Sequence, residues 1–385
     1  MPVLCVSAVA IILPSEPFSL YVHIPFCQKK CPYCAFYKEL WSEEKELDFV
    51  RALQGEIEAY RGRGLSFKTL FFGGGTPSKL SLNRLKEIFS SLEDVFSFTT
   101  SCEKTMECNP ESLTNELLDL LAEYHFNRIS LGIQSFHPEE LAFLGRRHSS
   151  EQIHAAIKRV QLHPQVFSIN LDFIFSTPIS TLDTLRFTID KALSYKPQHL
   201  SCYALSIEEG TIFEKNAVKP LDDDSELLQY KLIQQLLGNE GYQQYEVSAF
   251  AKPGFECEHN LAYWRYNDFL GLGPSANSFV GGYRASNVSD HLAYVRRPYP
   301  ALLEIKEPSS VSDQMRECFM SNLRLKEGLN IDTFEKRFPV NFHSFYEQPL
   351  QKYINEGFLF YDANILKTTD NGLYLLNEML QDFLL

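Results

Sequence analysis

Three cysteines lie within eight positions near the start of the chain. They are Cys27, Cys31 and Cys34 in the stretch HIPFCQKKCPYCAFY, and their spacing is C-x3-C-x2-C. This spacing differs from the paired CxxC pattern of structural zinc sites. Three thiolates can hold three irons of a [4Fe–4S] cube, which leaves the fourth iron open to an exchangeable ligand. The pattern indicates a cluster that also binds a small molecule; the alternative is a chance group of buried thiols.

A run of glycines is the second feature with chemical meaning. The stretch GGGTP occupies residues 73–77 and follows a short apolar run. Because glycine has no Cβ, such a run lets the backbone approach a ligand closely. Taken alone, it fits a plain tight turn equally well.

The residues between 19 and 207 alternate between short apolar runs and longer amphipathic ones. We expect six strands, at residues 19–24, 68–72, 104–108, 128–136, 166–175 and 199–207. Helices are expected between them, the first over 42–64 with Ser42 as its N-cap. Strands that alternate with helices in this way indicate a parallel sheet. Six units are too few for a closed eight-fold barrel, so an open partial barrel or a doubly wound sheet remains.

Polar residues follow the predicted strands at the ends where parallel barrels carry their function. The cysteine loop follows the first strand and GGGTP the second. The later strands supply, in order, Glu107, Gln134 with Arg146 a short helix later, Asp172 and Ala204. For any one of these polar residues alone, solvation of a strand end or a salt bridge is the plainer interpretation. Their agreement in position predicts one site around the three thiols.

The cysteine spacing after the first strand, together with GGTP after the second, resembles the radical S-adenosylmethionine (SAM) superfamily. The resemblance implies a partial (β/α)6 barrel, an α/β fold. It also implies that the amino and carboxylate groups of SAM chelate the open iron. In that superfamily the reduced cluster donates an electron, and the S–C5′ bond of SAM breaks to give a 5′-deoxyadenosyl radical.

Further stretches resemble the subfamily of oxygen-independent coproporphyrinogen III oxidases and heme chaperones, from about residue 17 to the end. They are YVHIPFCQKKCPYC, FFGGGTPS, ECNPESL, RISLGIQSF, LGRRHS, HLSCYALSIEEGT and HNLAYWRYNDFLGLGPSA. Three features favour the chaperones. Phe36 stands where the oxidases have a further cysteine, only 26 residues precede Cys27, and HNLAYW (259–264) matches the HNxxYW motif of the chaperones.

The resemblance implies a role for individual residues. Cys27, Cys31 and Cys34 would bind the cluster. The residues that would contact SAM are Tyr21, Tyr33, Gly74, Gly75, Thr76, Glu107, Gln134, Arg146, Asp172 and Ala204. Glu107 and Asp172 suit ammonium or ribose hydroxyl groups, and Arg146 suits a carboxylate. One departure is Ser176 in DFIFSTP, where the family usually has glycine.

His259 of the HNxxYW motif is the candidate heme ligand. A neutral imidazole is a good axial ligand for heme iron, and Tyr263 and Trp264 are flat enough to lie against a porphyrin. The alternative is that His259 caps a turn while both aromatic rings fill the core. Cys257 is a second candidate axial ligand, and His23 beside the cluster is expected to be structural.

The leading hypothesis is therefore a heme chaperone with a [4Fe–4S] cluster and SAM. It would bind heme and deliver it to heme-dependent proteins such as respiratory enzymes, without net porphyrin turnover. The first alternative is an oxygen-independent coproporphyrinogen III oxidase, which decarboxylates two propionates. The second is a radical SAM enzyme for an unrelated substrate.

Composition limits the other classes of function. The net charge of −13 argues against a general nucleic-acid binder, which needs a basic face. Nine unevenly spread cysteines fit reduced thiols in the cytoplasm better than a disulfide framework. The apolar start of the chain is too short to span a bilayer, so we expect at most peripheral membrane contact.

We expect four parts along the chain. An apolar extension covers residues 1–16, where an extra strand or a disordered extension is predicted. The barrel covers 17–215, and an extension of it with the HNxxYW motif covers 216–305. A smaller C-terminal α+β domain of winged-helix type covers 306–385, after a predicted linker at 296–310.

Overall fold

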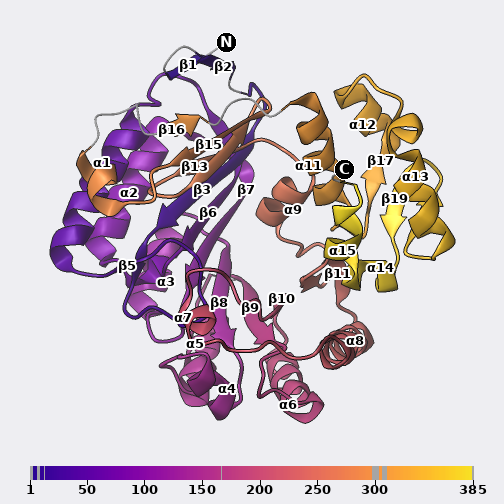
Figure 1. The fold of residues 1–385 in the computed structure, drawn as a ribbon. Helices are drawn as coiled ribbons and strands as arrows, with labels where there is room; N and C mark the ends of the chain where they lie inside the picture. Colours follow the sequence, from indigo (N-terminus) through magenta and orange to yellow (C-terminus); the bar gives the residue numbers. More distant parts are fainter. Residues whose placement is uncertain are drawn as a thin grey trace.

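The computed structural model of the chain describes residues 3–6, 9–12, 14–165, 167–296, 303–305 and 310–383. The six predicted strands are present and neighbour one another in the order β10-β9-β8-β7-β6-β3, all parallel (Figure 1). Their bounds are β3 Phe18–Ile24, β6 Ser66–Gly74, β7 Ser97–Cys108, β8 Arg128–Gln134, β9 Ser168–Phe175 and β10 His199–Ala204. The predicted partial barrel is confirmed.

Helices cover the outer face of these strands. They are α1 Glu43–Glu58, α2 Leu82–Val95, α3 Asn115–Glu123, α4 Pro138–Phe143, α5 Ser150–Leu162 and α6 Leu182–Leu193. Ser42 caps α1 as predicted, since its hydroxyl accepts from the amide of Lys45. The helix ends at Glu58, before the predicted residue 64, and Gly62 and Gly64 after it take φ of +77° and +67°.

The sheet continues beyond the barrel on both sides. Next to β3 lie β13 (Phe269–Leu272), β14 (Asn277–Val280), β15 (Tyr283–Asn287) and β16 (Leu303–Ile305); next to β10 lie β12 (Ala249–Ala251) and β11 (Gln243–Glu246). The predicted glycine-rich turn at GLGPSANSFVGG contains the β13–β14 hairpin instead. Gly271 permits it, because a Cβ there would lie 2.1 Å from the carbonyl oxygen of Asn277. Most of the predicted linker lies outside the described residues, but β16 within it pairs with β15.

Four helices accompany these added strands: α7 Ile212–Lys215, α8 Asp223–Asn239, α9 Glu258–Trp264 and α10 His291–Arg296. At the other end of the chain, β1 (Val3–Val6) and β2 (Val9–Ile12) pair antiparallel within the apolar extension. No helix of the described residues combines the length and apolarity needed to cross a bilayer.

The C-terminal part is a helical unit with a small antiparallel sheet. Its elements are α11 Val311–Asn322, β17 Leu329–Asn330, α12 Ile331–Arg337, α13 Phe342–Asn355, β18 Leu359–Asp362, β19 Ile365–Thr368, α14 Asp370–Tyr374 and α15 Leu376–Gln381. Its buried residues, such as Phe319 and Phe334, form a hydrophobic cluster separate from that of the barrel. The predicted smaller α+β domain is confirmed, while the residue boundaries between domains stay a prediction.

A buried carboxylate fastens α1 to the strands added beside β3. Glu56 accepts three hydrogen bonds, from the amide of Gly273 (2.9 Å), from Asn287 Nδ2 (2.6 Å) and from the Tyr294 hydroxyl (2.6 Å). Burial raises the pKa of Glu56, and the three donors act against that rise. This carboxylate therefore ties together elements more than two hundred residues apart in sequence.

We expect Glu56→Ala to lower the free energy of unfolding by about 3–5 kcal/mol, because three buried donors lose their acceptor at once. Urea unfolding followed by far-UV circular dichroism measures the change. Glu58→Ala is the matched control on the same helix: that carboxylate pairs with Arg61 at the surface, so little change is expected. Equal losses in the two variants would contradict the role given to Glu56.

Candidate functional site

The cysteine loop is held at its base by two short strands. β4 (Phe26–Cys27) and β5 (Glu39–Leu40) pair in parallel, and the amide of Trp41 donates to the carbonyl of Cys27 (3.1 Å). The loop between them carries Cys31 and Cys34. Its base directly follows β3, so the loop lies at the carboxyl ends of the barrel strands, as predicted.

All three thiols line one cavity of about 530 Å³. The same cavity is lined by most of the residues predicted to contact SAM: Tyr33, Gly74, Gly75, Thr76, Glu107, Gln134, Arg146, Asp172 and Ala204. Tyr21 is the exception and lines a neighbouring cavity. No three His, Cys, Asp or Glu side chains among the described residues converge tightly enough to hold a single metal ion. Three thiols that line one cavity suit a [4Fe–4S] cube, in which each iron takes one protein ligand.

Two glycines of GGGTP are required by close backbone contacts. Gly74 has a φ of +113°, and a Cβ on it would lie 2.6 Å from the His23 ring. A Cβ on Gly75 would lie 2.8 Å from the backbone oxygen of Phe26. The glycine run therefore brings the end of β6 against the chain that leads into the cysteine loop. This contact gives it a structural role that a plain turn does not need.

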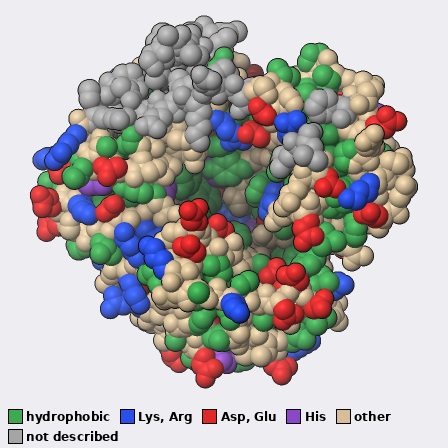
Figure 2. Space-filling model, in the orientation of Figure 1, with side chains coloured by type: hydrophobic (Ala, Val, Ile, Leu, Met, Phe, Trp, Pro, Cys, Tyr) green, Lys and Arg blue, Asp and Glu red, His purple; other side chains and the backbone are tan. Residues whose placement is uncertain are grey.

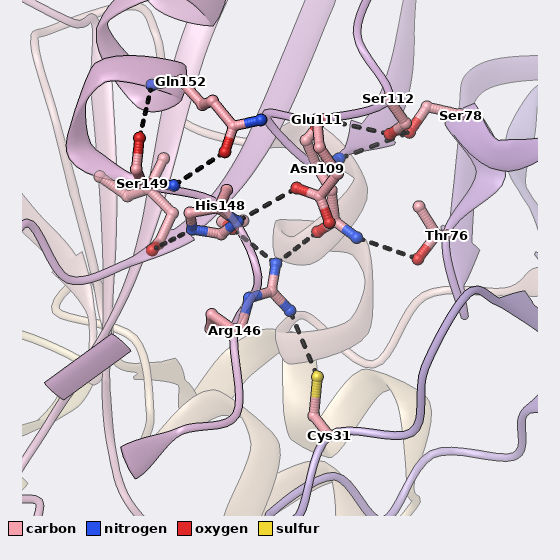
Figure 3. Close-up of polar contacts among 12 residues, drawn as sticks. Cys31, Thr76, Ser78, Asn109, Glu111, Ser112, Arg146, His148, Ser149 and Gln152 are labelled. Carbon is pink, nitrogen blue, oxygen red and sulfur yellow. Dashed lines mark hydrogen bonds and ion pairs between the residues drawn. The ribbon is translucent and has the colours of Figure 1, made fainter. Parts of the chain in front are cut away.

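A chain of hydrogen bonds connects Arg146, Asn109 and Thr76 to two of the thiols, and Figure 3 shows the part of it from Cys31 to Thr76. Arg146 donates through Nη1 to the Cys31 sulfur (3.5 Å) and through Nη2 to Asn109 Oδ1 (2.5 Å). Asn109 donates to the Thr76 hydroxyl (3.1 Å), which lies 3.8 Å from the Cys27 sulfur. Donors directed at sulfur stabilise the thiolate form that a metal cluster needs.

The loop that carries Arg146 is itself supported from behind. His148 Nε2 lies 3.1 Å from the carbonyl oxygen of Ile133, and its Nδ1 lies 3.1 Å from Glu111 Oε2. Figure 3 shows this imidazole on the side of Arg146 away from Cys31. The ring is held between an acceptor on β8 and another in the loop after β7. These two contacts fix the backbone next to Arg146 and so position its side chain.

Two half-buried carboxylates, Glu107 and Asp172, line the cavity. Glu107 accepts from the amide of Gly74 (3.2 Å), while Asp172 accepts from Ser130 (2.8 Å) and Asn170 (2.7 Å). Burial, and then the charge of Asp172, raise the pKa of Glu107 to about 8. Burial also raises the pKa of Asp172. A cation or hydroxyl groups between them would relieve this mutual repulsion.

The strand ends at this site include strained backbone. Gln134, at the end of β8, has a φ of +67°, and Ser176, just after β9, has a φ of +59°. This explains the departure noted above, because a left-handed position favours glycine. Ser176 is held there by its hydroxyl, which donates to Glu226 (2.5 Å), and by its amide, which donates to Gln229 (2.9 Å). Strain of this kind gathers at ligand sites.

A second cavity of about 720 Å³ adjoins the first. Figure 2 shows the surface hollowed between the barrel and the C-terminal part, with hydrophobic side chains inside the hollow. The two cavities share Ala35, Phe36, Glu107, Ser130, Asp172 and Tyr203. The other aromatic side chains that line the second cavity are Tyr21, Tyr37, Phe71, Tyr263, Trp264 and Phe269. Its size and lining suit a large flat ligand.

His259 lies at the wall of this second cavity and is buried. Its Nδ1 lies 2.8 Å from the Thr69 hydroxyl and its Nε2 lies 2.8 Å from the Tyr263 hydroxyl. The ring stacks on Phe71 at a centroid distance of 5.0 Å. Burial lowers the pKa of His259 to about 3, so the imidazole is neutral at physiological pH.

The neighbours of His259 fall into two groups. Tyr263 and Trp264 line the cavity together with it. Cys257 is buried and its thiol donates to Glu103 at 3.6 Å, and burial raises its pKa, so it is a poorer ligand than the neutral imidazole. His23 lies between the Tyr21 hydroxyl (3.0 Å) and the carbonyl of Tyr37 (3.0 Å), an arrangement typical of a structural histidine.

Sequence reasoning missed Glu103, Thr69 and Asn109. Glu103 on β7 accepts from the amides of Glu258 (3.2 Å) and His259 (3.0 Å), so it anchors the first turn of α9. Asn109 lies within the stretch ECNPESL, whose resemblance to the family could have identified it as a site residue. Glu103 and Thr69 are single polar residues in strands, and nothing local marks them.

Two family models match the chain. Residues 21–188 match the radical SAM superfamily, and residues 310–375 match the HemN C-terminal domain. The first implies a [4Fe–4S] cluster and SAM. The second coincides with the helical unit and its small antiparallel sheet.

Proteins named heme chaperone HemW are similar over nearly the whole chain. The chain is 31% identical to that of Lactococcus lactis over 374 residues, which cover 96% of this chain and 98% of the relative. It is 33% identical to that of Escherichia coli over 381 residues, with the same coverage.

The solved structure of coproporphyrinogen III oxidase (HemN) from Escherichia coli, a radical SAM enzyme, is also similar. Its TM-score is 0.83 at 25% identity, over 95% of this chain and 90% of that one. The relatives at 31% and 33% identity, matched over 96% of this chain, favour the heme chaperones over the coproporphyrinogen III oxidases. The chain belongs to the heme chaperone HemW family of the radical SAM superfamily.

Proposed function

We propose that this chain binds heme and delivers it to heme-dependent proteins, respiratory enzymes among them, and that it carries a [4Fe–4S] cluster and SAM. The observation that carries the proposal is the pair of adjoining cavities. One is lined by three thiols and the other by aromatic rings and the neutral imidazole of His259. The names of the HemW relatives support the cargo, and the radical SAM match supports the cofactors.

In the first cavity we assign Cys27, Cys31 and Cys34 to the cluster. When bound, the cluster and SAM together supply one-electron chemistry. The side chains that we assign to SAM hold it by charge: Arg146 suits its carboxylate, and Glu107 with Asp172 suits its ammonium or ribose hydroxyl groups. Tyr21, which we also assign to SAM, lines the second cavity.

In the second cavity we assign His259 as the axial ligand of heme. Ligation requires Nε2 without a proton, so Nδ1–H must donate to the Thr69 hydroxyl, as metal-bound histidines usually donate from their other nitrogen. The Tyr263 hydroxyl lies on Nε2 at 2.8 Å and has to leave it when iron binds. Tyr263 therefore competes with heme for the same nitrogen.

Substitutions at these two positions should have opposite effects. We expect His259→Ala to weaken heme binding about tenfold or more, since an axial ligand is lost. Tyr263→Phe should leave heme affinity unchanged or raise it up to about fivefold, since one competing hydrogen bond is removed. Titration of hemin followed at the Soret band measures both, and the low-spin spectrum should disappear only in His259→Ala.

The absorbance of the reconstituted cluster serves as the folding control in both variants. If Tyr263→Phe weakened heme binding as much as His259→Ala, the loss would have to be assigned to packing of α9. His259 would then be removed as the ligand.

Glu107 should make the binding of SAM depend on pH. Its pKa of about 8 means that it is largely protonated at pH 7. A cationic ligand favours the carboxylate, so binding expels a proton, and the affinity for SAM should rise up to about tenfold per unit between pH 6 and 8. Calorimetry in two buffers at each pH measures the affinity and the proton release.

Glu107→Gln should remove this slope. Glu208→Gln, at the exposed rim of the same cavity, is the matched control and should keep it. A wild-type affinity that stays flat from pH 6 to 8 would show that Glu107 does not contact the ligand.

The structural similarity to HemN keeps coproporphyrinogen III oxidase as the second candidate function. We expect no protoporphyrinogen IX when the reconstituted protein is incubated anaerobically with SAM, a reductant and coproporphyrinogen III. Chromatography detects the product, and the oxidase from Escherichia coli is the positive control. Formation of product at a catalytic rate would overturn the chaperone proposal.

A further inference from the structure

Arg128 is a buried cation at the wall of the second cavity. It is the first residue of β8, and only 3% of its surface is exposed. Its side chain lines the cavity together with His259, His199 and the aromatic rings. Neither the cluster nor the SAM residues assigned above give it a function.

The guanidinium of Arg128 uses only part of its hydrogen-bond donors within the chain. It donates through Nη1 to the carbonyl of Phe255 (3.1 Å), and it forms no ion pair with a carboxylate of the described residues. The two nearby carboxylates, Glu103 and Asp172, accept hydrogen bonds from other groups. Glu103 holds the amides of α9, and Asp172 accepts from Ser130 and Asn170.

The nearby carboxylates of Glu103 and Asp172 favour the charged form of Arg128 without pairing with it, so the N–H groups not used by Phe255 are left for a ligand in the cavity. Arginine presents its donors as a planar fork that matches a carboxylate in two places at once. The arrangement is therefore suited to an anionic group that arrives with the ligand. The aromatic lining around it requires the rest of that ligand to be flat and apolar.

We propose that Arg128 binds a carboxylate side chain of the tetrapyrrole, a propionate in the case of heme, and so sets which edge of the macrocycle enters the cavity first. This inference rests on the proposed binding of heme in the second cavity. The contact with Phe255 supports it. That residue lies two positions before Cys257, the N-cap of α9, so the helix that carries the iron ligand and the propionate anchor are held together.

The second arginine at this cavity is in a different state. Arg284 donates to Glu317 on α11 through Nε (2.9 Å) and pairs with it through Nη2 (2.8 Å). Its charge is already neutralised by a carboxylate of the C-terminal part. Arg284 is therefore a suitable control for Arg128: both line the cavity, but only Arg284 is paired with a carboxylate of the described residues.

The test compares hemin with hemin dimethyl ester, which has the same iron and ring but no carboxylates. Both are titrated into the full-length protein with its cluster reconstituted. We expect wild type to bind hemin about 10–100-fold more tightly than the diester, as a charge-assisted bidentate contact implies. In Arg128→Gln the ratio should fall to near 1, and in Arg128→Lys it should be intermediate. Arg284→Gln should keep the wild-type ratio.

The other outcomes show whether the inference about Arg128 or the proposed heme binding is wrong. If Arg128→Gln weakened hemin and diester equally, Arg128 would be structural and the inference would fall while heme binding stood. A ratio lost in Arg284→Gln instead would move the anchor to that residue. If His259→Ala changed the ratio while Arg128→Gln did not, the ester would be acting at the iron. Wild-type protein that bound neither ligand would overturn the proposed function itself.

Discussion

Six parallel strands cannot close a barrel, and the placement of α9 against β6 is the constraint on which the second cavity depends, because α9 supplies His259, Tyr263 and Trp264 to its wall. This helix is short, with seven residues, and cannot hold its position by its own hydrogen bonds. It is held by Glu103 on β7, whose carboxylate accepts two amides of the first turn. A negative charge at a helix N-terminus also suits the helix dipole. The result is that His259 faces Thr69 and Phe71 on β6.

The wall between the two cavities has a chemistry of its own. Glu107 and Asp172 line both cavities, and partial burial raises the pKa of each. Their charge state depends on what lies on either side, since a cation in one cavity stabilises both carboxylates. An anionic ligand in the other cavity meets the opposite field. If both proposed ligands bind, these two carboxylates are the groups through which occupancy of one cavity would affect the other.

The parts of the fold that sequence could predict are those with a local signal. The six barrel strands are apolar runs, and Ser42 caps α1 through a contact three residues away. The cysteine loop, GGGTP and the strand-end polar residues followed from one rule about parallel barrels, and the structure brings them to one cavity. Tyr21 and Tyr33 came only from the family resemblance, and of these two only Tyr33 lines that cavity. Glu103, Thr69 and Arg128 gave no such signal, because their partners lie far along the chain. The β13–β14 hairpin was not predicted, because the glycines in its sequence are typical of a turn.

A carrier differs from an enzyme in that it must give up what it binds. If His259 ligates heme iron as proposed, its Nε2 has a resident competitor in the Tyr263 hydroxyl at 2.8 Å. Because the hydrogen bond reforms when iron leaves, the empty site is not left with a bare buried nitrogen, which would otherwise oppose release. Thr69 on the other nitrogen keeps the ring oriented in both states. Exposed Phe36, which lines both cavities and is 71% accessible, leaves the opening beside the cluster loop apolar. Under the proposed ligation, this arrangement would favour the exchange of heme over its permanent retention.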